Sequence, residues 1–378
     1  MNFEFSEEQN LLKESVQRWA QDNYSFDQRR VGADSENGFN DQHWQTFAEL
    51  GWLSVPFDEQ YGGYGGSIID LAAVVQELGK VLVVEPFFPT VVLFGGVLQA
   101  SADEEVKSDL IPQIIDGSLF GSVAIYEQQS RFDMSNVATT ATAVGDGFQI
   151  NGTKTLVLGG AYAKQLIVLA RTSGEATDEQ GLSLFLLDTA SEGVTVNSYP
   201  LMDGQQVADI SFNNASAKLI SELDAGYTTL ASALQNAHVA LCAEATGIME
   251  TLNRTTIEYT KTRKQFDVAI SSFQALQHRM VDTFMSYEQC RSLLVGTLCE
   301  LTDESTTDKQ ALKIVNALRT LVAKNGKHIS DEAIQLHGGM GLTDELDVGH
   351  YAKRMMMINL MFGNGDFFQN EFNQAAYA

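Results

Sequence analysis

A cluster of cationic and aromatic side chains follows the longest apolar helical pattern in the sequence. Lys261, Arg263, Lys264 and Phe266 lie within one short segment. A guanidinium can bind a phosphate or a carboxylate through two parallel hydrogen bonds, whereas an ammonium acts as a point charge. Because the whole chain carries a formal net charge of -25, basic residues gathered in one place require an explanation, and they are compatible with binding of an anionic small molecule.

Other residue types that often carry chemistry form no recognisable site in the sequence. The three cysteines, Cys242, Cys290 and Cys299, have no CxxC spacing, and the six histidines include no HExxH pair. This pattern provides neither a disulfide framework nor a metal site, as in proteins of a reducing cytosol. We therefore expect no bound metal and a cytoplasmic location.

The composition narrows the classes of partner. The 378 residues are 44% hydrophobic, which is enough for two or three domains with a sizeable core. With 24 basic against 49 acidic residues, the chain should repel nucleic acid and anionic membrane surfaces. No apolar run reaches the ~18 residues of a membrane span. The acidic start, Met1 to Glu8, lacks the pattern of a signal peptide. We expect neither nucleic acid nor a membrane as a partner.

The elements that position the cationic cluster are predicted helices. Apolar side chains recur along one face of a helix of ~50 Å, from about 227 to 262: Leu230, Leu234, Ala237, Leu241, Ala245, Ile248, Met249 and Leu252. Further helical patterns follow at 271–303, 307–326, 328–337 and 349–372. In the first third, Ser6 and Gln9 form a predicted capping box, and helices are expected at 41–50, 67–78, 91–100 and 103–115.

Between these helical parts the pattern changes to short β-rich segments, from Leu119 to Phe212. Gly145-Asp-Gly147 predicts a hairpin turn between strands at 139–144 and 148–152, and further strands are expected at 166–171 and 182–187. The sequence therefore predicts three domains: a helical domain at 1–117, a β-barrel or sandwich at 118–218, and a helical bundle at 219–378.

This order of domains and motifs resembles the acyl-CoA dehydrogenase family over essentially the whole chain. The resemblance rests on Ser6-Glu-Glu-Gln9, on Pro56 with Tyr61-Gly-Gly63, on Gly152-Thr-Lys154, on Tyr259-x-x-x-Arg263-x-x-Phe266 and on Ala333 to Gly341. It implies α,β-desaturation of an acyl-CoA thioester with FAD. In that reaction a carboxylate takes the α proton, the flavin takes the β hydride, and an electron-transfer protein reoxidises the flavin.

The resemblance also implies the cofactor-binding residues. Arg263 and the loop with Gln335, Gly338 and Gly339 would reach across a subunit interface to the FAD of a neighbour, and Phe266 would cover its adenine or flavin ring. Glycines let backbone N–H groups approach phosphates. Gln265 and Gln274 would join this site, although a polar face between helices explains Gln274 equally well. A simple helix end and interhelical turn is the structural alternative for both motifs.

The sequence departs from the family where the chemistry should be. Phe362, in Met361-Phe-Gly-Asn364, stands where the resemblance places the catalytic Glu. The other family placement, a Glu-Arg pair on the long helix, falls on Ala237-His238. Neither Phe nor Ala can accept a proton, so we expect no catalytic residue in this chain.

The segments expected to hold the chain's own flavin are altered too. The flavin-facing Trp-Ile-Thr-Asn-like strand has become Leu156-Val-Leu-Gly159. The upstream segment, Tyr126 to Asp133, keeps only Glu127 and Asp133 of its family pattern. Residues that would serve a neighbour's flavin are retained, while residues that would serve the chain's own flavin are lost.

A narrower resemblance accounts for this split. Gln128-Gln-Ser-Arg-Phe-Asp133, Thr262 to Phe266, Ser272 to Arg279, Gly349-His-Tyr-Ala-Lys-Arg354 and Leu360-Met-Phe-Gly363 are similar to the small subunits of two-component family members, pimeloyl-CoA dehydrogenase among them. The resemblance implies a catalytic-base-lacking subunit that completes the FAD site of a catalytic paralogue, as in an α2β2 assembly. The substrate would be a fatty, dicarboxylic or steroid side-chain acyl-CoA.

Two alternatives stay open at this point. The chain could be a self-sufficient enzyme with a relocated base, for which Glu244 and Asp366 are the candidates, or a non-redox scaffold on the same fold. Glu244 is the one carboxylate in the apolar part of the long helix, and pairing with a cation such as Arg279 or Arg291 explains it better than catalysis. Asp366 fits a solvated helix cap equally well.

Overall fold

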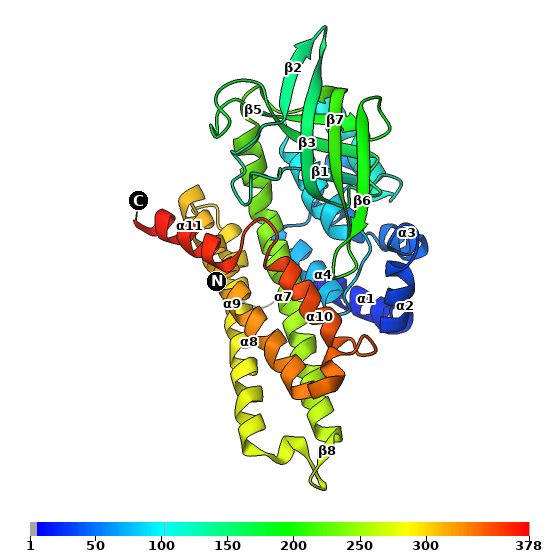
Figure 1. Cartoon of the computed structure of the whole chain (residues 1–378), viewed down its shortest axis with the longest axis vertical. Helices are drawn as coiled ribbons and strands as arrows, with labels where there is room; N and C mark the ends of the chain where they lie inside the picture. Colours follow the sequence, from blue (N-terminus) through cyan, green and yellow to red (C-terminus); the bar gives the residue numbers. More distant parts are fainter. Residues whose placement is uncertain (1–5, 102, 378) are drawn as a thin grey trace. The chain divides into compact units, whose positions relative to one another are not determined.

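The computed structural model describes residues 6–101 and 103–377, so the prediction made for the segment before Ser6 lies outside the described residues. The chain divides into two compact units. One consists of Met1–Arg29, Ile68–Val83 and His238–Ala378, and the other of Arg30–Ser67 and Val84–Ala237. Helix α7 (Gly226–Thr262) runs from the second unit into the first (Figure 1).

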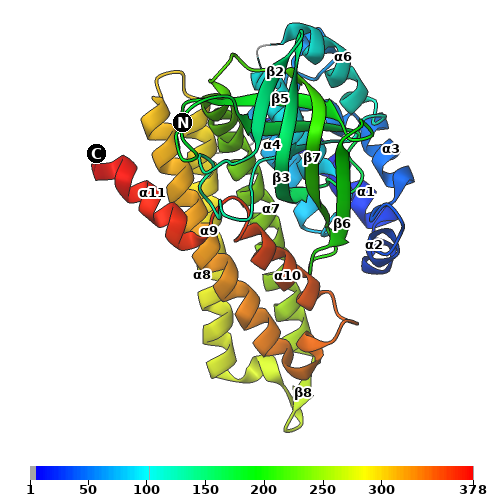
Figure 2. The same ribbon diagram turned by 45° about the horizontal axis from the view of Figure 1, so that its top comes forward.

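The first unit is helical. Besides α7 it contains α1 (Glu7–Asn23), α4 (Ile68–Gly79), α8 (Gln274–Leu301), α9 (Asp308–His337), α10 (Val348–Ile358) and α11 (Gly365–Tyr377). Figures 1 and 2 show α7, α8 and α9 side by side, with α11 crossing α9. All eight residues of the predicted apolar face of α7 are buried, which confirms that the helix is held by packing along that stripe. The predicted capping box of α1 is also present, with Ser6 and Gln9 bonded reciprocally.

Two helix boundaries in this unit differ from the prediction. The break expected near Gly326 is absent, because α9 continues to His337. A side chain at Gly326 would meet Met355 Sδ at 2.6 Å, so this glycine permits close packing rather than ending the helix. The single helix expected at 349–372 is instead two helices, α10 and α11. The chain is broken between them by positive φ angles at Phe362 and Gly363, of 61° and 153°.

The second unit holds the β domain and flanking short helices. These are α2 (Phe26–Ala33), which starts in the first unit, α3 (Asp41–Glu49), a π-helical segment at Phe87–Phe94, α5 (Gly95–Ala100) and α6 (Glu104–Ile115). The predicted helix at 91–100 therefore begins earlier, at Phe87, and its first part is a π-helix. π-helical segments, which have more residues per turn than an α-helix, are rare.

The sheet has seven strands: β1 (Gly121–Ala124), β2 (Thr140–Val144), β3 (Gly147–Leu158), β4 (Gln165–Arg171), β5 (Leu182–Asp188), β6 (Val194–Pro200) and β7 (Gln206–Leu219). Their order is β1-β4-β2-β3-β7-β5, and β6 pairs with β7 outside this order. Because β5 also pairs with β4, the sheet closes into a barrel. The predicted hairpin turn is confirmed, since β2 and β3 pair from Val144 and Gly147. The barrel core is apolar, with Ile150, Val168, Phe185 and Ile210 fully buried.

Candidate functional site

The cationic cluster forms a hairpin beyond the end of α7, which we call the arm (residues 263–272). The Arg263 N–H donates to the Tyr259 carbonyl at 2.8 Å, and Ile270 N–H closes the base of the arm on Arg263 O at 2.9 Å. Two short strands, β8 (Lys264–Gln265) and β9 (Val268–Ala269), pair antiparallel. Phe266 and Asp267 form the turn with φ angles of 52° and 65°. Two consecutive positive φ angles are typical of a tight hairpin turn that favours Asn or Gly.

The side chains from Arg263 to Val268 in the arm are exposed to solvent. Phe266, at the strained turn, is 87% exposed, and its ring lies edge to face with that of Phe273, with the centroids 6.3 Å apart. Arg263 and Gln265 are exposed, and neither side chain has a hydrogen-bond or ion-pair partner among the described residues. A bulky aromatic held at a positive φ and left exposed costs free energy that nothing within the described chain returns. This combination favours contact with another molecule.

The second predicted segment lies at the C-terminal end of α9. Gly338 caps this helix with φ 59° and ψ -140°, a conformation that only glycine adopts readily. A side chain built at Gly338 or at Gly339 would meet nothing within 4 Å. At Gly341, in contrast, it would meet Ile334 O at 2.8 Å. Packing within the chain therefore requires glycine at 341 but not at 339, and the space beside Gly338 and Gly339 is open to a ligand.

The structure brings the predicted cofactor residues to one end of the bundle. Tyr259, one turn before Arg263, stacks on His337, which precedes Gly338 (ring centroids 4.2 Å apart). Gln335 is exposed on the last turn of α9, and Gln274 is exposed at the start of α8, next to Phe273. All seven residues therefore lie near one end of the bundle, and their part in binding FAD stays a prediction.

The position expected for a catalytic base is filled by an aromatic cluster. Phe362 is buried, and its ring lies edge-on to His238 with the ring centroids 5.8 Å apart. The Phe368 ring is also edge-on to His238, at 5.1 Å. The Arg319 guanidinium sits over the Phe368 ring at 4.5 Å and donates to the carbonyls of Ile358 and Met361. None of these side chains is a carboxylate. Asp366, exposed in the first turn of α11, lies where its charge favours the helix N-terminus.

His238 is the one titratable imidazole of this cluster. Its buried Nδ1 has no hydrogen-bond partner within the described part of the chain. Burial, with a further contribution from the Arg319 charge, holds the pKa of His238 well below its usual value. The ring is therefore neutral at physiological pH. It packs as an aromatic side chain against Phe362 and Phe368.

Glu244 is a structural carboxylate. Its oxygens accept Nε of Arg354 at 2.6 Å and Nη2 at 2.8 Å, and both side chains are buried. The expected pairing with a cation is confirmed, but the predicted partners were wrong. Arg279 pairs with Glu332, and Arg291 pairs with Glu288. A carboxylate held by a bidentate guanidinium has little freedom to act as a base.

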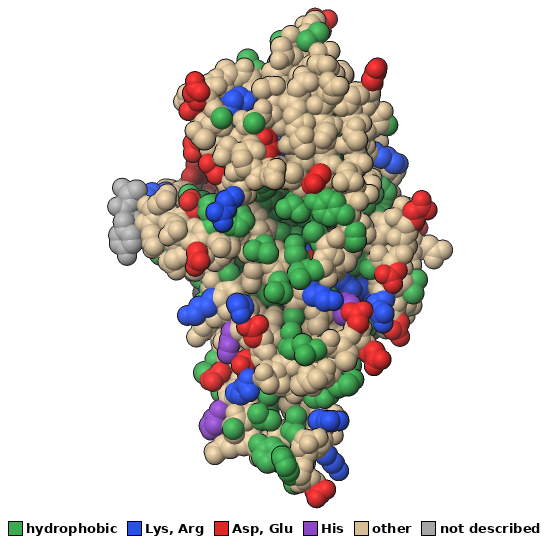
Figure 3. Space-filling view, viewed as in Figure 1, with side chains coloured by type: hydrophobic (Ala, Val, Ile, Leu, Met, Phe, Trp, Pro, Cys, Tyr) green, Lys and Arg blue, Asp and Glu red, His purple; other side chains and the backbone are tan. Residues whose placement is uncertain are grey.

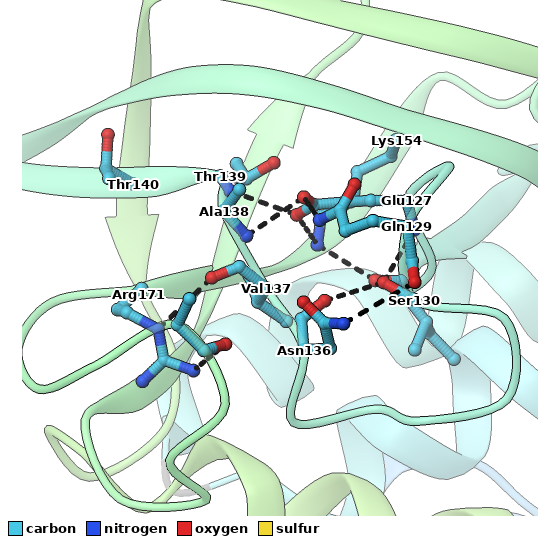
Figure 4. Close-up of polar contacts among 12 residues, drawn as sticks. Glu127, Gln129, Ser130, Asn136, Val137, Ala138, Thr139, Thr140, Lys154 and Arg171 are labelled. Carbon is cyan, nitrogen blue, oxygen red and sulfur yellow. Dashed lines mark hydrogen bonds and ion pairs between the residues drawn. The ribbon is translucent and has the colours of Figure 1, made fainter.

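In the β domain, the two residues retained from the flavin-side segment stabilise the fold, and Figure 4 shows the contacts of one of them, Glu127. Glu127 accepts the buried ammonium of Lys154 at 2.8 Å and the backbone N–H groups of Ala138 and Thr139. Burial alone would raise the pKa of Glu127, but Lys154 and these donors lower it to about 2. Asp133 accepts the N–H and hydroxyl of Ser135. Their retention needs no cofactor to explain it.

The strand expected to face the chain's own flavin is bulged. The pairing of β3 with β7 shifts between Lys154 and Val157, and Leu156 lies in the bulge with φ 54° and an exposed side chain. Its N–H donates to Asp209, which also accepts the Tyr199 hydroxyl. The Leu156 side chain is apolar, and the Leu156 N–H is already bonded to Asp209. This position therefore fits a flavin ring poorly, because the polar edge of that ring needs hydrogen-bond donors.

The sequence did not reveal Arg319 or Arg354 as structural residues. Both are buried arginines within helical patterns. The only signal is their place among apolar neighbours, such as Leu318 and Val322 around Arg319, which marks a buried cation without naming its partner. Among the described residues, no cluster of His, Cys, Asp and Glu could hold a metal ion, and no helix is long and apolar enough to cross a bilayer.

Comparisons with known proteins agree with this architecture. Three domain models of one family match the chain: the acyl-CoA dehydrogenase N-terminal domain at residues 6–118, the middle domain at 122–215 and the C-terminal domain at 224–372. A probable acyl-CoA dehydrogenase of Bacillus subtilis is 27% identical over 97% of each chain.

Solved structures share the fold. Butyryl-CoA dehydrogenase from Megasphaera elsdenii superposes with a TM-score of 0.90 at 21% identity, covering 100% of both chains. The ChsE4-ChsE5 complex from Mycobacterium tuberculosis does so with a TM-score of 0.89 at 23% identity, again covering 100% of both chains.

Proposed function

Because the chain belongs to the FAD-dependent acyl-CoA dehydrogenase family, we propose that it is the subunit without a catalytic base in a hetero-oligomeric acyl-CoA dehydrogenase. It completes the FAD site of a catalytic paralogue, which desaturates an acyl-CoA at its α and β carbons. The observation that carries this proposal is the aromatic cluster of Phe362, His238 and Phe368. It occupies the position where the reaction needs a carboxylate.

The length of α7 separates the arm from that cluster. The helix is continuous from His238 to Thr262, so Arg263 lies ~37 Å along the helix axis from His238. An arginine side chain is far too short to bridge this distance. Arg263 therefore cannot serve a ligand beside His238 of its own chain, and its exposed guanidinium fits a ligand held by another subunit.

The residues of the arm fit the polar part of FAD. The unpartnered guanidinium of Arg263 can pair bidentately with a pyrophosphate, and the open backbone at Gly338 and Gly339 admits close approach of a phosphate or ribose. FAD, when bound there, would supply the hydride acceptor for the partner's reaction. This chain's residues would hold the cofactor and shield it from water, with Phe266 covering a ring.

Exposed apolar side chains on the same unit support a subunit interface. Leu342 is 79% exposed directly after the glycine-rich segment Gly338–Gly341, which we call the glycine loop. Val281, Phe284 and Met285 are about half exposed on one face of α8. Figure 3 shows hydrophobic side chains together with Lys and Arg at the end of the bundle where β8 lies in Figure 1. Apolar side chains gathered in this way commonly mark a protein–protein contact.

The assembly and its partners follow from the same proposal. The solved ChsE4-ChsE5 structure is a complex of two named proteins, and its fold likeness supports an assembly such as α2β2 with a paralogue. The partners would be that paralogue, an acyl-CoA with a bulky or ω-functionalised chain, and an electron-transfer protein in the cytoplasm. A relationship to the small subunit of pimeloyl-CoA dehydrogenase fits the same proposal.

The test compares the chain alone with a complex. The chain is purified by itself and after co-expression with an acyl-CoA dehydrogenase paralogue from the same genome that carries the catalytic Glu. We expect FAD and acyl-CoA oxidation only in the complex. Arg263→Ala should lower the FAD content of the complex. Arg291→Ala, which replaces an exposed arginine on α8 outside the arm, should not. Stoichiometric FAD and turnover in the chain alone would overturn the proposal.

A further inference from the structure

One side chain connects the two segments that line the open end of the bundle. The Tyr259 ring stacks on the His337 imidazole at 4.2 Å with an angle of 28° between the planes, and its hydroxyl donates to the His337 carbonyl at 3.3 Å. Tyr259 is the last aromatic of α7 before the arm, and His337 is the last residue of α9 before Gly338. The contact therefore connects the end of α7, just before the arm, to the end of α9, just before the glycine loop.

The His337 side of this contact is fixed by its own hydrogen bond. His337 is buried, and its Nδ1 lies 2.8 Å from the carbonyl of Ala333 one turn earlier. Because a carbonyl only accepts, Nδ1 carries the proton. Burial holds the pKa of His337 below its usual value, so the ring is neutral. Gly338 follows at once with its left-handed φ, and the direction of the loop thus depends on where the His337 backbone is held.

The Tyr259 side is equally fixed. Its carbonyl accepts the N–H of Arg263 and, at 3.0 Å, the hydroxyl of Thr262. Tyr259 thus orients the first residue of the arm through its backbone and the glycine loop through its side chain. A site that holds both halves of a ligand surface in place before binding avoids the entropy cost of ordering them during binding.

We propose that Tyr259 is a positioning residue, which sets the spacing between Arg263 and the glycine loop (Gly338–Gly341) so that both meet one FAD of the neighbouring subunit. This inference rests on the proposed function. Tyr259 itself does not touch the cofactor in this scheme. Its effect on FAD affinity passes through Arg263 and the loop.

The test measures the dissociation constant of FAD for the co-expressed complex, with subunit composition checked by size exclusion. Tyr259→Leu removes the stack and the hydrogen bond, and we expect FAD binding to weaken about tenfold, or ~1.4 kcal/mol. Tyr259→Phe keeps the stack and should weaken binding only a few-fold. Tyr287→Leu is the matched control, because Tyr287 is a buried tyrosine of the same bundle that bonds to Glu250. It should lower thermal stability without changing FAD affinity.

The double variant Tyr259→Leu with Arg263→Ala distinguishes a role of Tyr259 in positioning Arg263 from a general destabilisation of the helical bundle. If Tyr259 acts through Arg263, the double variant weakens FAD binding by less than the product of the single effects. Unchanged FAD affinity in Tyr259→Leu, with weakened affinity in Arg263→Ala, would overturn this inference and leave the proposed function standing. Equal losses in Tyr259→Leu and Tyr287→Leu would also overturn it. Unchanged affinity in Arg263→Ala would overturn the proposed function itself.

Discussion

Replacing Glu244 by Gln separates a structural carboxylate from a relocated catalytic base. Glu244 on α7 and Arg354 on α10 form a bidentate ion pair whose side chains are 10% and 4% exposed. The substitution keeps the size of the side chain and one acceptor oxygen, but it removes the negative charge. Arg354 would then be a buried cation without its carboxylate.

The expected cost follows from that burial. Breaking a buried ion pair by removing one partner typically costs 3–5 kcal/mol. Because Gln can still accept one of the two guanidinium hydrogen bonds, we expect Glu244→Gln to lower the free energy of unfolding by about 3 kcal/mol. The pair Arg279–Glu332 is the control, since its side chains are 38% and 19% exposed. Glu332→Gln should cost about 1 kcal/mol or less.

Urea unfolding followed by the helical circular dichroism signal measures both effects. Replacing the pair by Glu244→Leu with Arg354→Met should recover most of the loss, because an apolar pair leaves no buried charge. Acyl-CoA oxidation by the complex should persist in Glu244→Gln at a temperature where the variant is folded. Lost turnover with unchanged unfolding would refute this reasoning and make Glu244 a base.

Three further outcomes are expected. The stability that Glu127 contributes is complete above its unfolded pKa of about 4.5, and it is lost as the pH falls towards about 2, its pKa in the folded chain. Glu127→Gln should remove this contribution to the pH dependence of the free energy of unfolding, measured by urea unfolding across that range. Phe266→Asn places a residue that tolerates positive φ in the turn, so it should raise the free energy of unfolding of the isolated chain by about 0.5–1 kcal/mol. The same variant should weaken subunit association, measured by analytical ultracentrifugation of the complex. His238→Leu removes a buried polar atom that has no partner among the described residues. Thermal melts should show the variant to be more stable by about 1 kcal/mol. Loss of turnover in the complex would instead show that His238 has a chemical role.

Periodicity and motif spacing predicted most of this fold because both are local. The apolar stripe of α7, the capping box of α1 and the hairpin turn after Val144 depend on residues a few positions apart. The partner of Glu244 lies 110 positions away. A helical pattern identifies the buried face but not which cation another helix presents to it. The break at Phe362 was missed for a related reason, since a positive φ at a non-glycine residue has no propensity signal.

The retained residues of the β domain show why a comparison of kept and lost motifs needs a structure. From the sequence, Glu127 and Asp133 look like remnants of a flavin site. In the fold Glu127 neutralises the buried Lys154 and binds the backbone at the start of β2, so replacing it would leave an unpaired buried ammonium. These positions would be kept whether or not FAD binds nearby.

The arm gives the opposite result. Arg263, Gln265, Phe266 and Gly339 are exposed or border open space, and no packing within the described chain requires them. Phe266 even lies at a backbone conformation that its side chain disfavours. An exposed aromatic such as Phe266, which lies at a disfavoured φ and meets the Phe273 ring at 6.3 Å, is best explained by a contact outside its own chain. The case for a shared FAD site therefore rests on the arm, ~37 Å along α7 from the aromatic cluster, and not on the motifs that the β domain retains for its own stability.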